Sequence, residues 1–224
     1  LTLDLKRAFP EVPIVLGGQV VINNEHNCYA HMGIDYVVHG YGEIALEKLV
    51  RHLSGQLPIE AIPGISYRRD GEVVTNPGRE FFKDINEMPL PAYHLVDMDH
   101  YATVNGLRLT KLQKYLDKTG KRITNHRFAM VMGTLGCTDR CTFCVHEQEF
   151  VGLKVFSNEY LLRHIRHLHE KYDINVFNIG EEMFITKLSR AREFNNLMKE
   201  HFPNVLWSAS TRADFVTPEM VAEL

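Results

Sequence analysis

A chain of 224 residues has room for one or two domains, and its 45% hydrophobic and 24% charged residues are ordinary for a soluble globular protein. The formal net charge of −3 gives no electrostatic reason to expect a nucleic-acid partner. No apolar run approaches the length of a membrane span and no signal peptide is recognisable, so we expect a cytoplasmic protein whose thiols stay reduced.

Helical and strand patterns alternate in the first quarter of the chain. The patterns predict helices over residues 1–9 and part of 20–32, and strands over residues 12–16 and 35–39. A further helix begins at Glu43 and is closed by Gly55, with apolar positions at Leu46, Leu49, Val50 and Leu53. This order predicts an α/β layer built on a parallel sheet.

Glycines follow both of these predicted strands. Gly17 and Gly18 come after the first strand, and Gly40 and Gly42 come after the second, just before Glu43. Parallel sheets bind ligands at the carboxyl ends of their strands, and a residue without a Cβ lets a ligand approach the backbone. The pattern therefore indicates a binding edge, with the alternative that the glycines only form turns.

The middle of the chain connects two predicted domains. Residues 62–76 predict a β-hairpin with its turn at Asp70-Gly71, which closes the first domain. Pro89 and Pro91 then mark an extended connector. A basic, partly helical run over residues 111–122 is interpreted as an exposed helix, with contact to an acidic partner or substrate as the alternative.

Three closely spaced cysteines follow an apolar, β-prone run over residues 128–134. They form a C-x-x-x-C-x-x-C pattern at Cys137, Cys141 and Cys144, so a strand delivers three soft ligands to one loop. Thiolates favour iron–sulfur clusters, zinc or copper(I), and a structural zinc site usually has four ligands. The remaining cysteine, Cys28, lies more than a hundred residues upstream and is expected to be buried. Three ligands would leave one iron of a cubane cluster open.

The last part of the chain alternates strand and helix again. Ser157 is a candidate cap for a helix with inward positions Leu161, Ile165, Leu168 and Tyr172, and a strand over residues 174–179 follows. A helix over residues 186–201, a strand over 205–210 and a helix from about 217 complete the pattern. This order predicts half of a (β/α) barrel with its active site at the carboxyl ends of the strands. The histidines of the first helix, His164, His167 and His169, are expected on its solvent face.

The cysteine segment resembles the radical S-adenosylmethionine (radical SAM) enzymes. The resemblance rests on the cysteine spacing, on Gly136 before the first cysteine and on Phe143 before the third. It implies a 4Fe–4S cluster on the three cysteines, with SAM on the open iron and its reductive cleavage to a 5′-deoxyadenosyl radical. It also implies a carboxylate after the second strand for the methionine amine, and here that segment reads Ile-Gly-Glu-Glu. The expected SAM contacts are Phe143, Gly180, Glu181, Glu182, Ser210 and Arg212, with a surface salt bridge as the alternative for Arg212 and substrate contact considered for His146.

The glycine-containing segments are similar to the second half of the cobalamin-binding domain that precedes the barrel in one large radical SAM subfamily. The similarity covers VPIVLGGQVV and GIDYVVHGYGEIALEKLV and continues through the hairpin and the proline-containing connector. It implies that Gly17, Gly18, Gly40, Gly42 and Glu43 lie near the nucleotide tail of the corrinoid.

The sequence therefore predicts a fragment of a longer enzyme, with an α/β fold in three parts. These are part of a Rossmann-like cobalamin-binding domain at 1–80, a connector at 81–126, and the first half of a radical SAM barrel at 127–224. The subfamily implies methyl transfer to an unactivated carbon of a small-molecule substrate, with a reducing partner such as flavodoxin or ferredoxin. The alternatives are an oxidative cyclase or ring-rearranging enzyme, an enzyme that lacks cobalamin, and a non-catalytic zinc-binding structural module.

Overall fold

A computed structural model describes residues 1–22, 24–102, 113–118, 125–139, 141–144, 152–180 and 183–223. The chain divides into two compact units. The first consists of Leu1–Lys83 and Asp139–Phe150, and the second of Asp84–Thr138 and Val151–Leu224. Among the described residues, no helix combines the length and apolar character that crossing a membrane requires.

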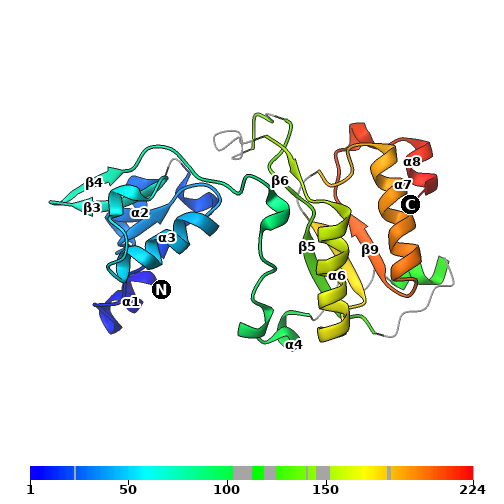
Figure 1. The fold of residues 1–224 in the computed structure, drawn as a ribbon, viewed down its shortest axis with the longest axis horizontal. Helices are drawn as coiled ribbons and strands as arrows, with labels where there is room; N and C mark the ends of the chain where they lie inside the picture. The colour runs from blue at the N-terminus through cyan, green and yellow to red at the C-terminus, as the bar shows by residue number, and fades with distance from the viewer. Residues whose placement is uncertain are drawn as a thin grey trace. The chain divides into compact units, whose positions relative to one another are not determined.

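The first unit is a small α/β layer (Figure 1). Its elements are α1 (Thr2–Ala8), β1 (Val15–Leu16), α2 (Glu25–His31), β2 (Tyr36–Val38), α3 (Glu43–Leu53), β3 (Ile65–Arg69) and β4 (Glu72–Thr75). The sheet order is β1-β2-β3-β4, in which β1 and β2 are parallel and the other pairs are antiparallel. The predicted α/β order is thus confirmed, with antiparallel strands added by the hairpin.

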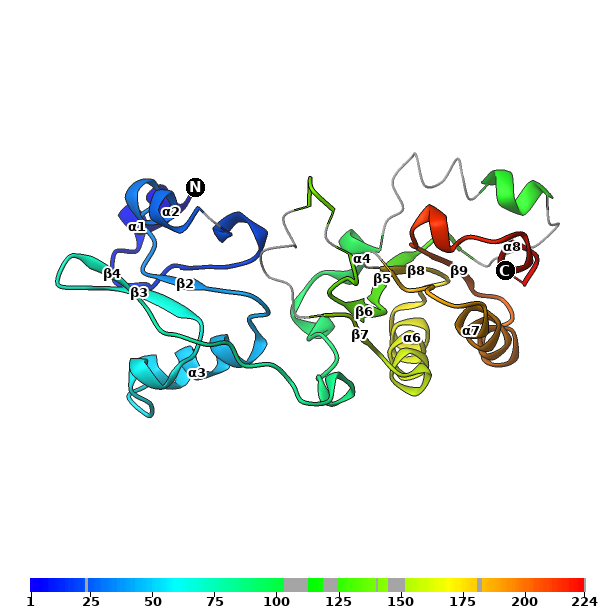
Figure 2. The same ribbon diagram turned by 90° about the horizontal axis from the view of Figure 1, so that it is seen from above.

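The sheet of the first unit buries both faces. Consecutive residues of a strand point to opposite faces, and in β2 Val37 packs with Cys28 and Tyr29 of α2 while Val38 packs with Leu49 of α3. Figure 2 shows α1 and α2 on one side of this sheet and α3 on the other. Cys28 is fully buried in the first of these cores, as expected.

Helix α3 buries a narrower stripe than its sequence pattern suggests. Ala45 and Leu49 face the core, whereas Leu46, Val50 and Leu53 are 47%, 59% and 47% exposed. The reason is that β1 and β2 contribute only two and three residues, so the sheet covers a single line of positions on the helix. The hairpin turn agrees with its prediction, because Asp70 and Gly71 have positive φ angles of 52° and 87°.

The second unit contains a parallel sheet of order β5-β8-β9 with α6 (Asn158–Tyr172) and α7 (Leu188–His201) on one face (Figure 2). Its elements are α4 (Met98–Tyr101), β5 (Phe128–Met132), β6 (Thr134–Leu135), β7 (Lys154–Val155), α6 (Asn158–Tyr172), β8 (Val176–Gly180), α7 (Leu188–His201), β9 (Leu206–Ala209) and α8 (Pro218–Glu223). Residues 113–118 are also helical. The strand–helix alternation predicted for this part of the chain is confirmed.

Burial alternates along the strands of the second unit. Val131, Phe177 and Ile179 are fully buried, as are Leu161, Ile165 and Phe194 on the helices that cover this face. Met130, Asn178 and Ser208 are in register on the other face, where Met130 is 52% exposed. Ser157 caps α6 as predicted, because the Tyr160 N–H donates to its Oγ at 3.1 Å.

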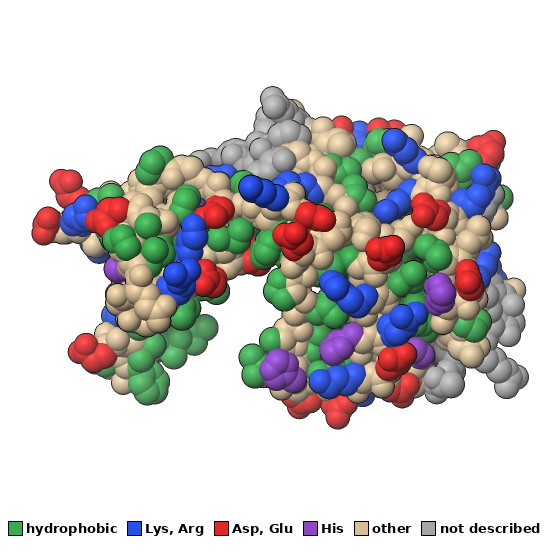
Figure 3. Space-filling view, in the orientation of Figure 1, with side chains coloured by type: hydrophobic (Ala, Val, Ile, Leu, Met, Phe, Trp, Pro, Cys, Tyr) green, Lys and Arg blue, Asp and Glu red, His purple; other side chains and the backbone are tan. Residues whose placement is uncertain are grey.

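One prediction for α6 is wrong. His164 does not face solvent; it is 3% exposed, and its Nε2 lies 2.7 Å from the Tyr93 hydroxyl oxygen. Burial, with smaller contributions from His167 and Arg163, lowers the pKa of His164 to about 4. His167 and His169 are half-buried, and the outer surface over α6 mixes histidine with basic and acidic side chains (Figure 3). The sequence pattern missed this burial because the covering residue, Tyr93, comes from the connector.

The burial of His164 predicts a pH-dependent stability. Between pH 6.5 and about 4, the unfolded chain binds a proton at this histidine that the folded chain excludes, so the free energy of unfolding falls as the pH falls. A pKa difference of that size between the folded and the unfolded chain changes the free energy of unfolding by about 3 kcal/mol at most. We expect the His164→Gln variant to lose this part of the slope in urea unfolding measured from pH 7 to pH 4.5. His201→Gln, which changes an exposed histidine of α7 that does not act on His164, should keep the wild-type slope; equal slopes in all three proteins would contradict the assignment.

Candidate functional site

Three parallel strands of the second unit end at one edge. Met132 of β5 is paired with Gly180 of β8, and Ile179 of β8 is paired with Ala209 of β9. The segments that follow these strands carry the cysteines, the predicted acidic residues and the Ser210-Thr211-Arg212 run. Parallel pairing therefore makes these three segments start side by side, as the barrel prediction requires.

The cysteine segment begins directly after β6. Strands β6 and β7 pair at the base of residues 136–153, and Gly136 takes a positive φ of 75° just before Cys137. Cys137, Cys141 and Cys144 are of intermediate burial, and none of them forms a disulfide within the described residues. The Cys144 N–H donates to the Cys141 carbonyl at 2.9 Å, so the second and third cysteines share one turn. These are accessible, reduced sulfur donors.

Cys137 contacts the segment that follows β8. Its Sγ lies 3.2 Å from Sδ of Met183, and the Thr138 hydroxyl lies 3.4 Å from the same sulfur. Met183 is fully buried. The first cysteine therefore packs against the residue that comes just after Gly180-Glu181-Glu182. The sequence pattern gave no signal for Met183.

The predicted SAM contacts differ in their surroundings. Phe143 is 91% exposed, and Gly180 is buried at the end of β8. Ser210 is exposed, and its carbonyl accepts the Phe184 N–H at 3.1 Å. Glu181, Glu182 and His146 lie outside the described residues.

Arg212 has a partner next to it in the chain. Its Nε and Nη2 donate to the two carboxylate oxygens of Asp214 at 3.0 and 2.9 Å. This hydrogen bonding holds the pKa of the Asp214 carboxyl below its usual value. The salt bridge considered as the alternative for Arg212 is thus present, and its contact with SAM stays a prediction.

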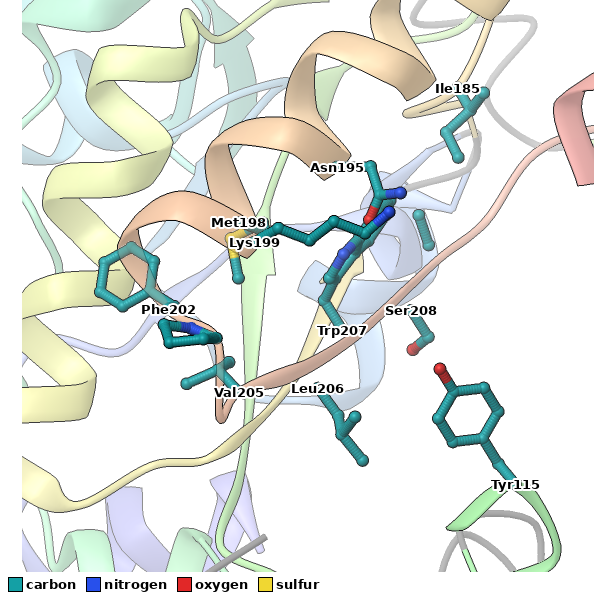
Figure 4. Close-up of a pocket in the computed structure, with 12 residues that line it drawn as sticks. Tyr115, Ile185, Asn195, Met198, Lys199, Phe202, Val205, Leu206, Trp207 and Ser208 are labelled. Carbon is teal, nitrogen blue, oxygen red and sulfur yellow. The ribbon is translucent and has the colours of Figure 1, made fainter. Parts of the chain in front are cut away.

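A cavity of about 350 Å³ lies along β9 and α7 (Figure 4). Trp207, Ser208 and Ala209 line it from the strand, and Asn195 and Lys199 line it from the helix. Tyr115, from the helical residues 113–118, points toward Ser208. The cavity combines an aromatic wall with a few polar groups, which is the usual composition of a small-molecule site.

The glycines of the first unit also meet at one edge of their sheet. A Cβ at Gly17 would lie 3.4 Å from the Val38 carbonyl oxygen, and one at Gly42 would lie 3.4 Å from Val38 Cγ1. Both loops therefore pack against the last residue of β2. Gly18 and Gly40 have positive φ angles of 79° and 76°, a conformation that favours glycine.

Gly42 also caps α3. Its carbonyl accepts the Leu46 N–H at 2.7 Å, and exposed Glu43 is the first residue of the helix. The structure thus brings together all five residues predicted to lie near the corrinoid tail at the carboxyl edge of β1 and β2. Whether they contact a corrinoid stays a prediction.

A ring of four polar side chains, which the sequence analysis missed, supports this edge. His39 Nε2 lies 2.7 Å from Ser66 Oγ and 3.4 Å from Glu25 Oε1. Ser66 Oγ is 2.9 Å from Thr75 Oγ1, which donates to Glu25 at 3.5 Å and closes the ring. Ser66 is fully buried, so its hydroxyl depends on these partners. The ring connects α2, β3 and β4 to His39, which lies between the end of β2 and Gly40.

The donor chemistry fits the groups that the sequence motifs imply. Three thiols in one loop suit an iron–sulfur cluster with an open iron better than a four-ligand zinc site. Within the described residues, no three His, Cys, Asp or Glu side chains are already arranged as a metal site. The fit therefore rests on donor type and on the spacing of Cys137, Cys141 and Cys144.

No protein-family model matches the chain. Among curated proteins, an uncharacterized methyltransferase of Pyrococcus horikoshii is 27% identical over 203 residues, which cover 90% of this chain and 40% of the relative. The anaerobic magnesium-protoporphyrin IX monomethyl ester cyclase of Synechocystis is 26% identical over 215 residues, which cover 96% of this chain and 39% of the relative. The chain thus spans about 40% of the length of these curated relatives.

Solved structures share the fold. The radical SAM methyltransferase TsrM of Kitasatospora setae, solved with cobalamin and a [4Fe–4S] cluster, superposes with a TM-score of 0.61 over 95% of this chain and 40% of its own. Its sequence identity of 18% supports the fold alone. The resemblance to cobalamin-type radical SAM enzymes that the motifs indicate is confirmed by the cobalamin-dependent radical SAM methyltransferase TokK of Streptomyces tokunonensis. It is 31% identical over 145 residues, which cover 62% of this chain and 18% of the relative.

The polar ring at His39 predicts different effects for two amide substitutions. A Gln side chain places its amide nitrogen where Nε2 lies in His39, whereas Asn reaches only as far as Nδ1. We therefore expect His39→Gln to keep most of the stability, and His39→Asn to lose about 1 to 3 kcal/mol because Ser66 is left buried with one partner fewer. Urea unfolding monitored by circular dichroism measures both. Equal losses in the two variants would mean that the ring does not hold this edge.

Proposed function

We propose that this chain is part of a radical SAM enzyme that uses cobalamin to transfer a methyl group to a carbon of a small molecule. The observation that carries the proposal is the position of the cysteines. Cys137, Cys141 and Cys144 follow the first of three parallel strands whose carboxyl ends share one edge. Active sites built on such sheets lie at that edge. The chain's similarity to a methyltransferase, and its fold likeness to one with cobalamin and a cluster bound, support the same function.

The three cysteines would hold a 4Fe–4S cluster with one iron left for SAM. When bound, the cluster and SAM supply the one-electron chemistry that generates a 5′-deoxyadenosyl radical, and methylcobalamin supplies the methyl group. The work of the protein is to bind and orient these groups. In this role Cys137 is held by the buried sulfur of Met183, which excludes water from one side of the thiol.

The acidic segment after β8 would orient SAM. A carboxylate can pair with the methionine ammonium, and such charge-assisted hydrogen bonds are shorter and stronger than neutral ones. Glu181 is closer to the strand end than Glu182 and is the preferred partner. Arg212 would have to exchange Asp214 for the SAM carboxylate or ribose, which is inexpensive because the present pair is exposed to water.

The glycine edge of the first unit would accept the nucleotide tail of the corrinoid. Gly17 and Gly42 leave space beside Val38, and Gly18 and Gly40 have backbone conformations that L side chains rarely adopt. Glu43 at the start of α3 would face the same ligand. A reducing partner such as flavodoxin or ferredoxin and a cytoplasmic location complete the proposal.

An oxidative cyclisation is the second candidate reaction. It is favoured by the chain's similarity to the magnesium-protoporphyrin ester cyclase. The cofactors and their proposed ligands would be the same in both cases, so the two candidates differ in the substrate and in the bond that is formed. A zinc-binding structural module is less well supported, because three thiols do not complete a structural zinc site.

The cluster assignment is tested on the full-length protein, reconstituted anaerobically with iron and sulfide. We expect the reduced protein to give a cubane electron paramagnetic resonance signal that shifts when SAM is added. Cys141→Ala should abolish the signal, because two thiolates do not hold the cluster, whereas Cys28→Ala should retain it, because Cys28 is buried in another core. If the protein held zinc in place of iron, or if the signal did not change when SAM is added, the radical mechanism would be wrong.

Corrinoid binding is tested with two glycine variants that both place a side chain at a positive φ. Gly18 and Gly55 have φ angles of 79° and 77°, and a Cβ at either position meets no atom within 4 Å. Alanine should therefore cost each site about 1 to 3 kcal/mol of stability, with the larger loss at Gly18, whose ψ of −168° belongs to a region that is nearly exclusive to glycine. Only Gly18→Ala should also weaken cobalamin binding, measured by corrinoid absorbance after dialysis of the full-length protein. Wild-type protein that retains no corrinoid, or equal retention in both variants, would contradict the assignment.

A further inference from the structure

Gly133, at the end of β5, is packed too tightly to carry a side chain. A Cβ at this position would lie 2.5 Å from Ile179 Cγ2 and 2.5 Å from Phe184 Cδ2, which real Cβ atoms do not tolerate. Its carbonyl accepts the N–H of Phe156, the residue after β7, at 3.2 Å. Gly133 therefore joins the strand that leads to the cysteines, the strand that returns from them, and the segment after β8.

Phe184 fills the space that Gly133 leaves. It is 1% exposed and packs edge-to-face on Phe194 of α7, with ring centroids 5.0 Å apart. Its N–H donates to the Ser210 carbonyl at 3.1 Å, and the carbonyl of the next residue, Ile185, accepts the Thr211 hydroxyl. Phe184 thus fixes the segment after β8 to the segment after β9.

Arg190 closes this arrangement from α7. Its guanidinium carbon lies 4.8 Å from the centroid of the Phe184 ring, and its Nη2 donates to the Phe156 carbonyl at 2.9 Å. Among the described residues, its buried Nε has no hydrogen-bond partner. No described carboxylate lies within ion-pair distance of it, and burial lowers the pKa of the guanidinium despite the nearby Glu193.

A half-buried cation without a carboxylate partner is costly to maintain. Here the face of the Phe184 ring and the Phe156 carbonyl offset the cost. Phe184 belongs to the segment after β8, and Phe156 directly follows β7, the strand that returns from the cysteines. A planar guanidinium can stack on a ring and donate in its own plane at the same time, which a lysine ammonium cannot do. The contacts therefore depend on arginine and not on positive charge alone.

We propose that Gly133, Phe184 and Arg190 form a clamp that fixes residues 183–185 against the base of the cysteine segment and thereby sets the affinity for SAM. The inference rests on the proposed function and deepens it. None of the three residues needs to touch SAM; each is a positioning residue. Phe184 follows Glu182, a proposed SAM contact, by two residues in the sequence.

The test compares two identical substitutions on the full-length protein with its cluster reconstituted. Arg190→Lys breaks the clamp, whereas Arg163→Lys is the control: Arg163 stacks on Tyr160 at 5.1 Å but on the exposed side of α6. Iron and sulfide content, the melting temperature and the dissociation constant for SAM by equilibrium dialysis are measured for each. We expect a ten- to hundredfold weaker affinity for SAM in Arg190→Lys, at wild-type iron content, and no change in Arg163→Lys.

A second variant protects the test against a folding defect. Phe184→Leu keeps an apolar side chain but removes the ring face, so it should weaken SAM binding in the same direction. The double variant Phe184→Leu/Arg190→Lys should be less impaired than the two single effects combined, because both remove one shared contact.

The outcomes separate the clamp from the proposed function. Wild-type protein that carries a cluster but binds no SAM would overturn both. Wild-type protein that binds SAM, with Arg190→Lys and Phe184→Leu of unchanged affinity, would overturn the clamp alone. A lower melting temperature with unchanged affinity in the folded protein would likewise reduce the three residues to ordinary core packing.

Discussion

The parallel pairing of β5, β8 and β9 is the constraint on which the candidate site depends. Parallel ladders place all carboxyl ends at the same edge, and the registers Met132–Gly180 and Ile179–Ala209 align those ends closely. Segments that are far apart in sequence therefore begin next to one another. The pairing itself is stabilised on the covered face, where fully buried strand residues pack against α6 and α7. Function on one edge thus depends on apolar packing beneath it.

The first unit uses the same constraint on a smaller scale. Only two of its strands are parallel, yet this is enough to bring the Gly17 and Gly42 loops to the same residue, Val38. The antiparallel hairpin then contributes Ser66 and Thr75, which complete the polar ring beneath His39. A short sheet offers little apolar area, so a connected polar network around the buried Ser66 hydroxyl gives the edge rigidity that core size alone would not.

Local chemistry explains what could be predicted from the sequence. The Ser157 cap, the Asp70-Gly71 turn and the strand–helix alternation follow from neighbouring residues, and the cysteine spacing carries its own chemistry. Burial of particular polar side chains does not, because it depends on distant partners. His164 is covered by Tyr93, 71 residues away, and Arg190 is held by a carbonyl 34 residues away. A helical pattern specifies which face is apolar, but it does not specify what will cover the other positions.

Two arginines, Arg212 and Arg190, illustrate the difference between an exposed cation and one held by distant partners. Arg212 has an exposed carboxylate two residues away, so it can exchange Asp214 for a ligand at little cost in free energy, because water screens both pairs. Arg190 is anchored by Phe184 and the Phe156 carbonyl, and moving it would leave a half-buried charge with no partner. Exchangeable cations suit ligand binding, whereas fixed ones suit the positioning of neighbouring segments. The sequence offers Arg212 as a predicted SAM contact, whereas Arg190 stands out only in the packing around Gly133 and Phe184.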